Sequence, residues 1–157
     1  MTVGVKSVAA VIEGNRVLVR EAHEPAIKSM AFSFIGSPLQ PGENVEACLH
    51  RVVKEVLGVT LMPVRLLYVH ENLWLQDKQD HQEIAFYFLC RVRGGIETNS
   101  AGEVHSRDPK VHLKLVPLEE LDTQRLYPPA LRKEFPRDMR TGFKEGVKHL
   151  LDDQRAK

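Results

Sequence analysis

Residues 36–59 of the chain read GSPLQPGENVEACLHRVVKEVLGV. Two prolines and a glycine in the first half of this segment break any regular element, so a loop is expected there. Asn44 is a residue type that caps helices, and the apolar residues that follow it recur at steps of three and four. This spacing predicts a helix over residues 45–57, and Gly58 suits the left-handed turn that closes a helix.

Apolar runs on both sides of this segment predict a sheet. A Gly-Asn pair at residues 14–15 separates two such runs, which is the pattern of a hairpin. Residues 84–92 are nearly continuously apolar, as expected for a strand that is covered on both faces. Pro63 is expected to break the strand pattern that follows the helix. Further short strands are expected at residues 32–35, 59–61, 64–69 and 111–116.

The remaining segments predict loops and helices. Gly94–Lys110 is polar and rich in turn-forming residues, and a loop of this length is often functional. A short helical turn is expected at Pro117–Leu121, and a helix begins at Tyr127–Leu131, where proline is tolerated in the first turn. The apolar residues of Phe143–Leu151 fit an amphipathic C-terminal helix. No linker divides residues 1–157, so a single domain is expected.

The composition is that of an ordinary globular protein. The 22 basic and 21 acidic residues nearly cancel, and a net charge of +1 gives no general attraction to nucleic acid or to a membrane. No apolar run approaches the ~20 residues that cross a bilayer, and no signal peptide is recognisable. Cys48 and Cys90 lie among apolar residues, which favours buried thiols in a reducing cytoplasm. His70, one of seven histidines without metal-ligand spacing, is assigned no role.

Residues 36–59 resemble the Nudix box, whose signature is G-x5-E-x7-R-E-U-x-E-E-x-G-U, where U is a bulky aliphatic residue. The positions that match this signature are Glu43, Arg51, Val53, Glu55, Gly58 and Val59. The positions that depart from it are Ser37, which replaces the opening glycine, and Val52 and Val56, which replace two glutamates.

The similarity to this family continues after the box. The segments that carry it are Glu71–Trp74, Glu83–Leu89 and Val116–Leu121. Gln82 stands where the family pattern has a histidine, although His81 is adjacent to it. The resemblance covers roughly residues 3 to 135, which is most of the chain.

The resemblance implies an α/β fold of the Nudix type, an α/β/α sandwich in which a central mixed sheet lies between helices. It also implies a reaction, the hydrolysis of a nucleoside diphosphate linked to another group. Magnesium ions would bridge the pyrophosphate and activate the attacking water, because the pyrophosphate is densely charged and water is a poor nucleophile. The expected partner is therefore a small nucleotide or another phosphorylated ligand.

The metal carboxylates of this family come from three helix positions that share one face, at i, i+3 and i+4. In this chain those positions are Val52, Glu55 and Val56, so one carboxylate remains. A single carboxylate predicts weak magnesium binding. Glu55 is either a residual catalytic and metal ligand or the helical partner of Arg51. Glu43 is either a metal ligand or the partner of Arg51 that holds the loop against the helix.

Other candidates lie outside the box. Glu83 begins the strongest strand, and it is either a replacement catalytic carboxylate or an exposed residue at a strand end. Arg20 is a candidate substrate contact for phosphate, as are Lys28 and Arg65, although scattered surface bases are the common case. Trp74 is next to a polar turn and is the best candidate for stacking on a base, because aromatic residues in strands are more often core.

Three functions remain open. The first is a Nudix pyrophosphohydrolase with an altered carboxylate set, and the second is a Nudix-fold module that binds its ligand without turnover. The third is an interaction scaffold, for example a homodimer. Losing one group that stabilises transition-state charge costs ~3–4 kcal/mol, so two lost glutamates argue against efficient catalysis by the usual route. Metal ligands can nevertheless move to other positions.

Overall fold

The computed structural model describes residues 3–24, 27–121 and 125–155. In chain order its elements are β1 (Val3–Glu13), β2 (Arg16–Glu24), β3 (Ser29–Ser33), β4 (Ile35–Pro38), α1 (Val45–Leu57), β5 (Leu61–Gln76), β6 (Gln79–Val92), β7 (Glu103–Val104), β8 (His112–Pro117), the 3₁₀ turn η1 (Leu118–Glu120), α2 (Leu131–Arg140) and β9 (Lys148–Asp153).

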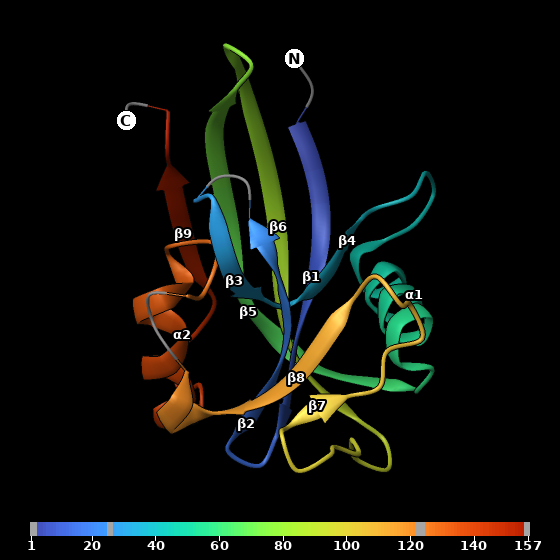
Figure 1. Ribbon diagram of the computed structural model, residues 1–157. Coiled ribbons are helices and arrows are strands. Elements are labelled where there is room, and N and C mark those ends of the chain that lie inside the picture. The colour runs from blue at the N-terminus through green and yellow to red at the C-terminus, as the bar shows by residue number, and fades with distance from the viewer. Residues whose placement is uncertain (1–2, 25–26, 122–124, 156–157) are drawn as a thin grey trace.

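The strands form a mixed sheet in the order β7-β8-β2-β1-β6-β5-β9. Strand β1 runs parallel to β6, and β5 runs parallel to β9, whereas the other neighbouring pairs are antiparallel. Helix α1 lies on one side of the strands and α2 on the other (Figure 1). The predicted α/β/α sandwich with a central mixed sheet is therefore confirmed.

Alternation along β1 explains why the sheet needs a helix on each side. Val8, Ala10 and Ile12 belong to one buried apolar cluster, which also contains residues of α2. Ala9 and Val11 point the other way and belong to a second cluster, which contains the apolar residues of α1. Successive side chains of a strand point to opposite faces, so a strand that is apolar at every position must be covered twice. We call these clusters the α2-side core and the α1-side core.

The predicted helix over residues 45–57 is confirmed as α1. Its buried residues are Cys48, Leu49, Val52, Val53 and Val56. Both cysteines of the chain are buried and free, as expected from their apolar neighbours. No helix within the described residues is long and apolar enough to cross a membrane.

Two strand predictions are wrong in detail. Pro63 does not interrupt the strand after α1, because β5 passes it in a single run and absorbs it with a register shift between Pro63 and Arg65. The short strand expected at residues 32–35 is divided between β3, which pairs with β2, and β4, which pairs with β1. In both places the pairing partners set the boundaries, which local apolar runs do not reveal.

The amphipathic helix expected at Phe143–Leu151 is also wrong. Gly142 and Phe143 both have positive φ angles, of 71° and 56°, and the chain then enters β9, which pairs in parallel with β5. The apolar side chains follow a strand period, since Leu150 is 8% exposed and Leu151 is 55% exposed. The open edge of β5 offers backbone hydrogen bonds, and this tertiary pairing overrides a weak helical pattern.

Candidate functional site

Helix α1 is fixed by caps at both ends. The side chain of Asn44 accepts a hydrogen bond from the backbone N–H of Ala47 at 2.8 Å. Gly58 has a φ of 72°, and its N–H donates to the carbonyl of Lys54, in the left-handed conformation that glycine adopts without strain. An added Cβ at Gly58 would lie 2.6 Å from Nε of Arg107. These caps fix where α1 begins and ends.

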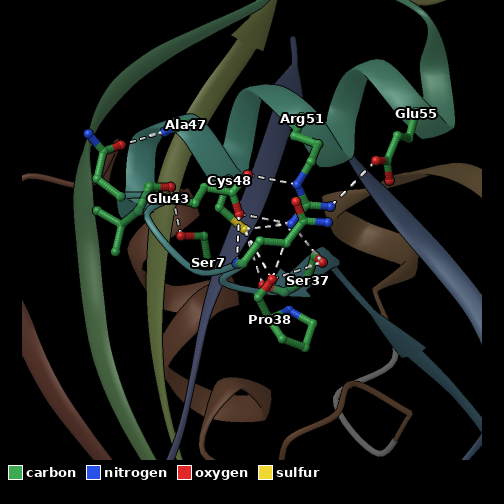
Figure 2. A network of polar contacts seen from close by, with 11 residues as sticks. Ser7, Ser37, Pro38, Glu43, Ala47, Cys48, Arg51 and Glu55 are labelled. Carbon is green, nitrogen blue, oxygen red and sulfur yellow. Dashed lines mark hydrogen bonds and ion pairs between the residues drawn. The ribbon is translucent and has the colours of Figure 1, made fainter.

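Arg51 joins the loop before α1 to the helix itself (Figure 2). Its Nε donates to one carboxylate oxygen of Glu43 at 2.8 Å, and its Nη2 donates to the other at 3.0 Å. Nη2 also donates to the carbonyl of Pro38 at 3.1 Å and to the hydroxyl of Ser37 at 3.2 Å. The hydrogen bonds from Arg51 and from the backbone of Gln40 lower the pKa of Glu43 to about 2. Both oxygens of Glu43 are therefore engaged in holding the loop.

The three helix positions that would face a metal lie in different surroundings. Val52 and Val56 are 5% and 7% exposed and belong to the α1-side core. The side chain of Glu55 is 59% exposed, and its carboxylate lies 3.5 Å from Nη1 of Arg51. In the part of the chain that the structure describes, no three Asp, Glu, His or Cys side chains are grouped to hold a metal ion. A single exposed carboxylate beside an arginine does not fit the oxygen cluster that a magnesium–pyrophosphate site requires.

The segment Gly94–Lys110 packs against the C-terminal end of α1. The backbone N–H of Arg107 donates to the carbonyl of Val56 at 2.7 Å, and Val104 belongs to the α1-side core. With β8 this segment lines a hollow of about 820 Å³. None of the candidate residues named above lines this hollow. The hollow therefore has no link to the phosphate chemistry that the resemblance implies.

A second pocket, of about 750 Å³, lies over the sheet and gathers three of the candidates: Arg20, Trp74 and Glu83. We call it the sheet pocket. Glu43 and Glu55 do not line it, and neither do Lys28 and Arg65. The candidates thus divide into a structural group around α1 and a pocket group on the sheet. The side chains that line the sheet pocket and carry polar groups include Lys6, Arg20, His23, Glu24, Ser33, His70, Asn72, Trp74, Gln76, Glu83, Tyr87, Tyr127 and Gln154.

Strand register places the pocket residues next to one another. Glu83 on β6 is paired with Asn72 on β5, and Asn72 is paired with Asp152 on β9. Two positions further along the strands, Trp74 is paired with His81, and the two rings stack with their centroids 5.4 Å apart. Paired residues of neighbouring strands point to the same face of the sheet. The polar row and the stacked pair therefore lie on one face.

The charges of the pocket come mainly from β1, β2 and β6. Nζ of Lys6 lies 3.0 Å from a carboxylate oxygen of Glu83, and both side chains are about one-quarter to one-third exposed, at 31% and 25%. The Lys6 ammonium therefore balances the Glu83 carboxylate. Arg20 is exposed and lines the same pocket, where it can meet an anion.

Several residues in or next to the sheet pocket are not recognisable as site residues from the sequence. Nε2 of His70 lies 2.8 Å from a carboxylate oxygen of Asp152, and the same oxygen accepts the backbone N–H of Ala130 at 3.0 Å. His70 is only 1% exposed. Three consecutive polar residues at positions 70–72 of a largely apolar strand are the one local signal for these side chains. Asp152 carries no such signal because its role depends on the pairing of β9.

Comparison with known proteins shows which family has this arrangement. The family model described as the NUDIX domain matches residues 5–138, well over half of the chain. The chain belongs to the Nudix family. No curated protein matches it.

Solved structures of Nudix proteins share the fold. A NUDIX hydrolase from Nitrosomonas europaea has a TM-score of 0.64 and 10% identity, with 95% of this chain and 79% of that chain covered. A UDP-X diphosphatase has a TM-score of 0.65 and 17% identity, with 97% and 68% covered. An ADP-ribose pyrophosphatase from Streptococcus suis has a TM-score of 0.57 and 17% identity, with 96% and 100% covered.

The Nudix assignment confirms the resemblance carried by residues 36–59. Two positions at which the family signature has glutamate are Val52 and Val56 in this chain, and both valines lie in the core of the domain. The family fold and the box loop are retained, while the face of α1 that would carry a carboxylate cluster is apolar at two of three positions.

Proposed function

We propose that this Nudix-family protein binds a nucleoside diphosphate derivative, or a related phosphorylated ligand, in the sheet pocket. The box helix would then support the fold and would not act as a metal-dependent hydrolytic centre. One observation carries this proposal. The sheet pocket gathers Arg20 and Trp74, whereas Val52 and Val56 are buried in the α1-side core.

The chemistry of the pocket suits such a ligand. Arg20 offers a planar set of N–H donors, which matches phosphate geometry and forms strong charge-assisted hydrogen bonds. Lys6 on the neighbouring strand β1 also lines the pocket, where its ammonium is paired with Glu83. Trp74 offers an aromatic face, and bases stack on such faces without strict sequence preference. The names of two structural neighbours, a UDP-X diphosphatase and an ADP-ribose pyrophosphatase, refer to the same class of ligand.

Hydrolysis is the second candidate, and Glu83 is the observation that favours it. This carboxylate lies in the sheet pocket with the cations and the indole ring. Its ion pair with Lys6 at 3.0 Å opposes a role as a base, because the ammonium already occupies one of its carboxylate oxygens. Binding without turnover is therefore the function that we put first.

A binding experiment with matched variants tests the proposal. Calorimetric titration of UDP and ADP into the wild-type protein is expected to show saturable binding. Arg20→Ala is expected to weaken that binding by about tenfold or more, since hydrogen bonds to charged groups contribute ~1.5–3 kcal/mol. Arg91→Ala is the control, because Arg91 is exposed on β6 and does not line the pocket.

Two results would contradict the proposal. Equal effects of Arg20→Ala and Arg91→Ala would remove the pocket as the binding site. Rapid hydrolysis of UDP-glucose or ADP-ribose by the wild-type protein, abolished by Glu83→Gln, would establish the second candidate.

The organisation and location of the chain are also proposals. The family match over residues 5–138 supports a single domain. Two free and buried thiols, at Cys48 and Cys90, support a reducing cytoplasm, where such thiols persist.

A further inference from the structure

Strand β9 forms one edge of the mixed sheet. It is the last strand in the order β7-β8-β2-β1-β6-β5-β9, and it lies on the outer side of β5 (Figure 1). Strand β7, at the other end of this order, has two residues, whereas β9 has six. An edge strand presents a row of unpaired backbone N–H and C=O groups, and very short edge strands limit this exposure. The longer edge at β9 is therefore a template for pairing with another strand.

One hydrogen bond shows which backbone groups of β9 face outward. The backbone N–H of Gln154 donates to the carbonyl of Leu73 on β5 at 2.8 Å. The N–H and C=O of one residue in a strand point to the same neighbour, and those of the next residue point the other way. The even-numbered residues of β9 therefore direct their backbone groups to β5. The outward groups are those of His149, Leu151 and Asp153.

The side chains of the same three residues lie on the exposed face of β9. Leu151 is 55% exposed, and the side chains of His149 and Asp153 are 63% and 41% exposed. Nε2 of His149 lies 2.5 Å from a carboxylate oxygen of Glu71, and a carboxylate oxygen of Asp153 lies 2.8 Å from Nη2 of Arg155. An exposed leucine is therefore flanked by an exposed imidazole and an exposed carboxylate.

These side chains complement themselves in one antiparallel register. Two identical strands related by a two-fold axis form a self-complementary contact. An axis at Leu151 places leucine opposite leucine, and it places His149 of each copy opposite Asp153 of the other. Residues directly opposite each other in an antiparallel pair interact, and apolar pairs and pairs of opposite charge stabilise it. Axes at His149, Asp152 or Asp153 would place like groups opposite each other. An axis at Leu150 would place Leu151 opposite His149.

The backbone favours the same register. A hydrogen-bonded antiparallel pair exchanges both N–H···O=C bonds, and such pairs recur at every second residue. With the axis at Leu151, each outward residue of one copy lies opposite an outward residue of the other. The groups of His149, Leu151 and Asp153 then form three hydrogen-bonded pairs, and the sheet continues into the second molecule.

We propose that two copies of this chain associate through antiparallel pairing of their β9 strands, with the two-fold axis at Leu151. The second copy is the partner because the exposed face of β9 complements its own charges and its own apolar residue. Gln154 lines the sheet pocket, and its side chain alternates with that of Asp153, so the pocket lies on the opposite face. The association is therefore independent of the proposed function. A single strand pair is a small interface, and a weak, concentration-dependent dimer is expected.

Sedimentation velocity of the purified full chain tests the association. The wild-type protein is expected to shift from monomer to dimer as its concentration rises. Leu151→Lys places two ammonium groups opposite each other and is expected to weaken the dimer by about tenfold or more. Val3→Lys is the matched control, because Val3 is 46% exposed and lies on β1, which β6 and β5 separate from β9. Both variants are expected to keep the unfolding temperature and the UDP affinity of the wild-type protein.

A disulfide tests the register. Cα atoms of a hydrogen-bonded antiparallel pair lie about 5.5 Å apart, within the range that a disulfide spans. Leu151→Cys is expected to form a covalent dimer under mild oxidation, whereas the native Cys48 and Cys90 are buried. Val147→Cys is the control, because Val147 is 56% exposed and the axis places it opposite Arg155 of the second copy. It is expected to form a covalent dimer about tenfold or more slowly.

Three results would overturn this inference. A wild-type chain that stays monomeric at every concentration would exclude a second copy as the partner and leave the edge to a strand of another protein. Dimerisation that Leu151→Lys and Val3→Lys weaken equally would exclude β9 as the interface. Equal rates of covalent dimer formation by Leu151→Cys and Val147→Cys would exclude the register. Nucleotide binding in the sheet pocket is measured separately, so none of these results bears on the proposed function.

Discussion

Restoring the lost carboxylates of the box is the perturbation whose consequence follows most directly from the structure. Val52 and Val56 are 5% and 7% exposed in the α1-side core. Burial of a valine side chain contributes about 1.5–3 kcal/mol, and a glutamate at either position would lose that contribution. It would also bury an unpaired charge, for which the effective penalty is several kcal/mol. Each single substitution is therefore expected to lower the free energy of unfolding by roughly 3–5 kcal/mol at neutral pH.

The loss of free energy of unfolding is large enough to determine whether the double variant folds. Domains of this kind are stable by about 5–15 kcal/mol in total. Val52→Glu combined with Val56→Glu is therefore expected to leave little or no folded protein at pH 7. Urea unfolding followed by circular dichroism measures the loss. His50→Glu is the control, because His50 is exposed on α1, and it is expected to change stability by no more than about 0.5 kcal/mol.

The pH dependence gives a second readout. Burial raises the pKa of a carboxyl group, so the introduced glutamate binds its proton more tightly in the folded state than in the unfolded state. The destabilisation is then smallest below about pH 4 and grows as the pH rises toward the folded-state pKa. A double variant that is as stable as the wild-type protein and binds magnesium tightly would show that Val52 and Val56 face an open cleft. The box helix would then carry an open metal face and not an apolar one.

Other predictions follow from single contacts. Arg51 holds the pKa of Glu43 at about 2, below its usual 4.5, so the stabilisation is present above about pH 4.5 and is lost as the pH falls toward 2. The stability difference between wild type and Arg51→Met is expected to shrink over that range in acid titrations of unfolding. Gly58→Ala is expected to cost ~1–2 kcal/mol, seen as a lower Tm, because Gly58 has a φ of 72° and its Cβ would meet Arg107. Lys148→Met is expected to cost ~3 kcal/mol in urea unfolding, because the Lys148 ammonium contacts three carboxylates between 2.7 and 3.1 Å.

The elements with strong local signals are the ones that sequence reasoning places correctly. Helix α1 is predictable over its whole length because Asn44, the three-and-four spacing and Gly58 all agree. The C-terminal strand β9 is not predictable in the same way. It exists because the edge of β5 is available for parallel pairing, and no local pattern in residues 143–151 reports that edge.

The sequence predicts which residue types belong to the site, but it does not predict which of them lie together. Arg20, Trp74 and Glu83 are chosen from the sequence for their charge or ring, and strand register brings them to one pocket. Gln154 and Asn72 are 82 residues apart, and their contact depends on the β5–β9 pairing. The sequence therefore contains the chemical groups of the pocket, while the long-range pairing that aligns them is visible only in the fold.

Ligand binding with and without magnesium tests the central claim most directly. The measurement is calorimetric titration of UDP into the wild-type protein, first in EDTA and then in excess Mg²⁺, followed by chromatography of a parallel incubation with UDP-glucose. The sheet pocket predicts saturable binding in EDTA, similar affinity in Mg²⁺, and no magnesium-dependent release of UMP. Binding that requires Mg²⁺, together with magnesium-dependent release of UMP, would contradict it.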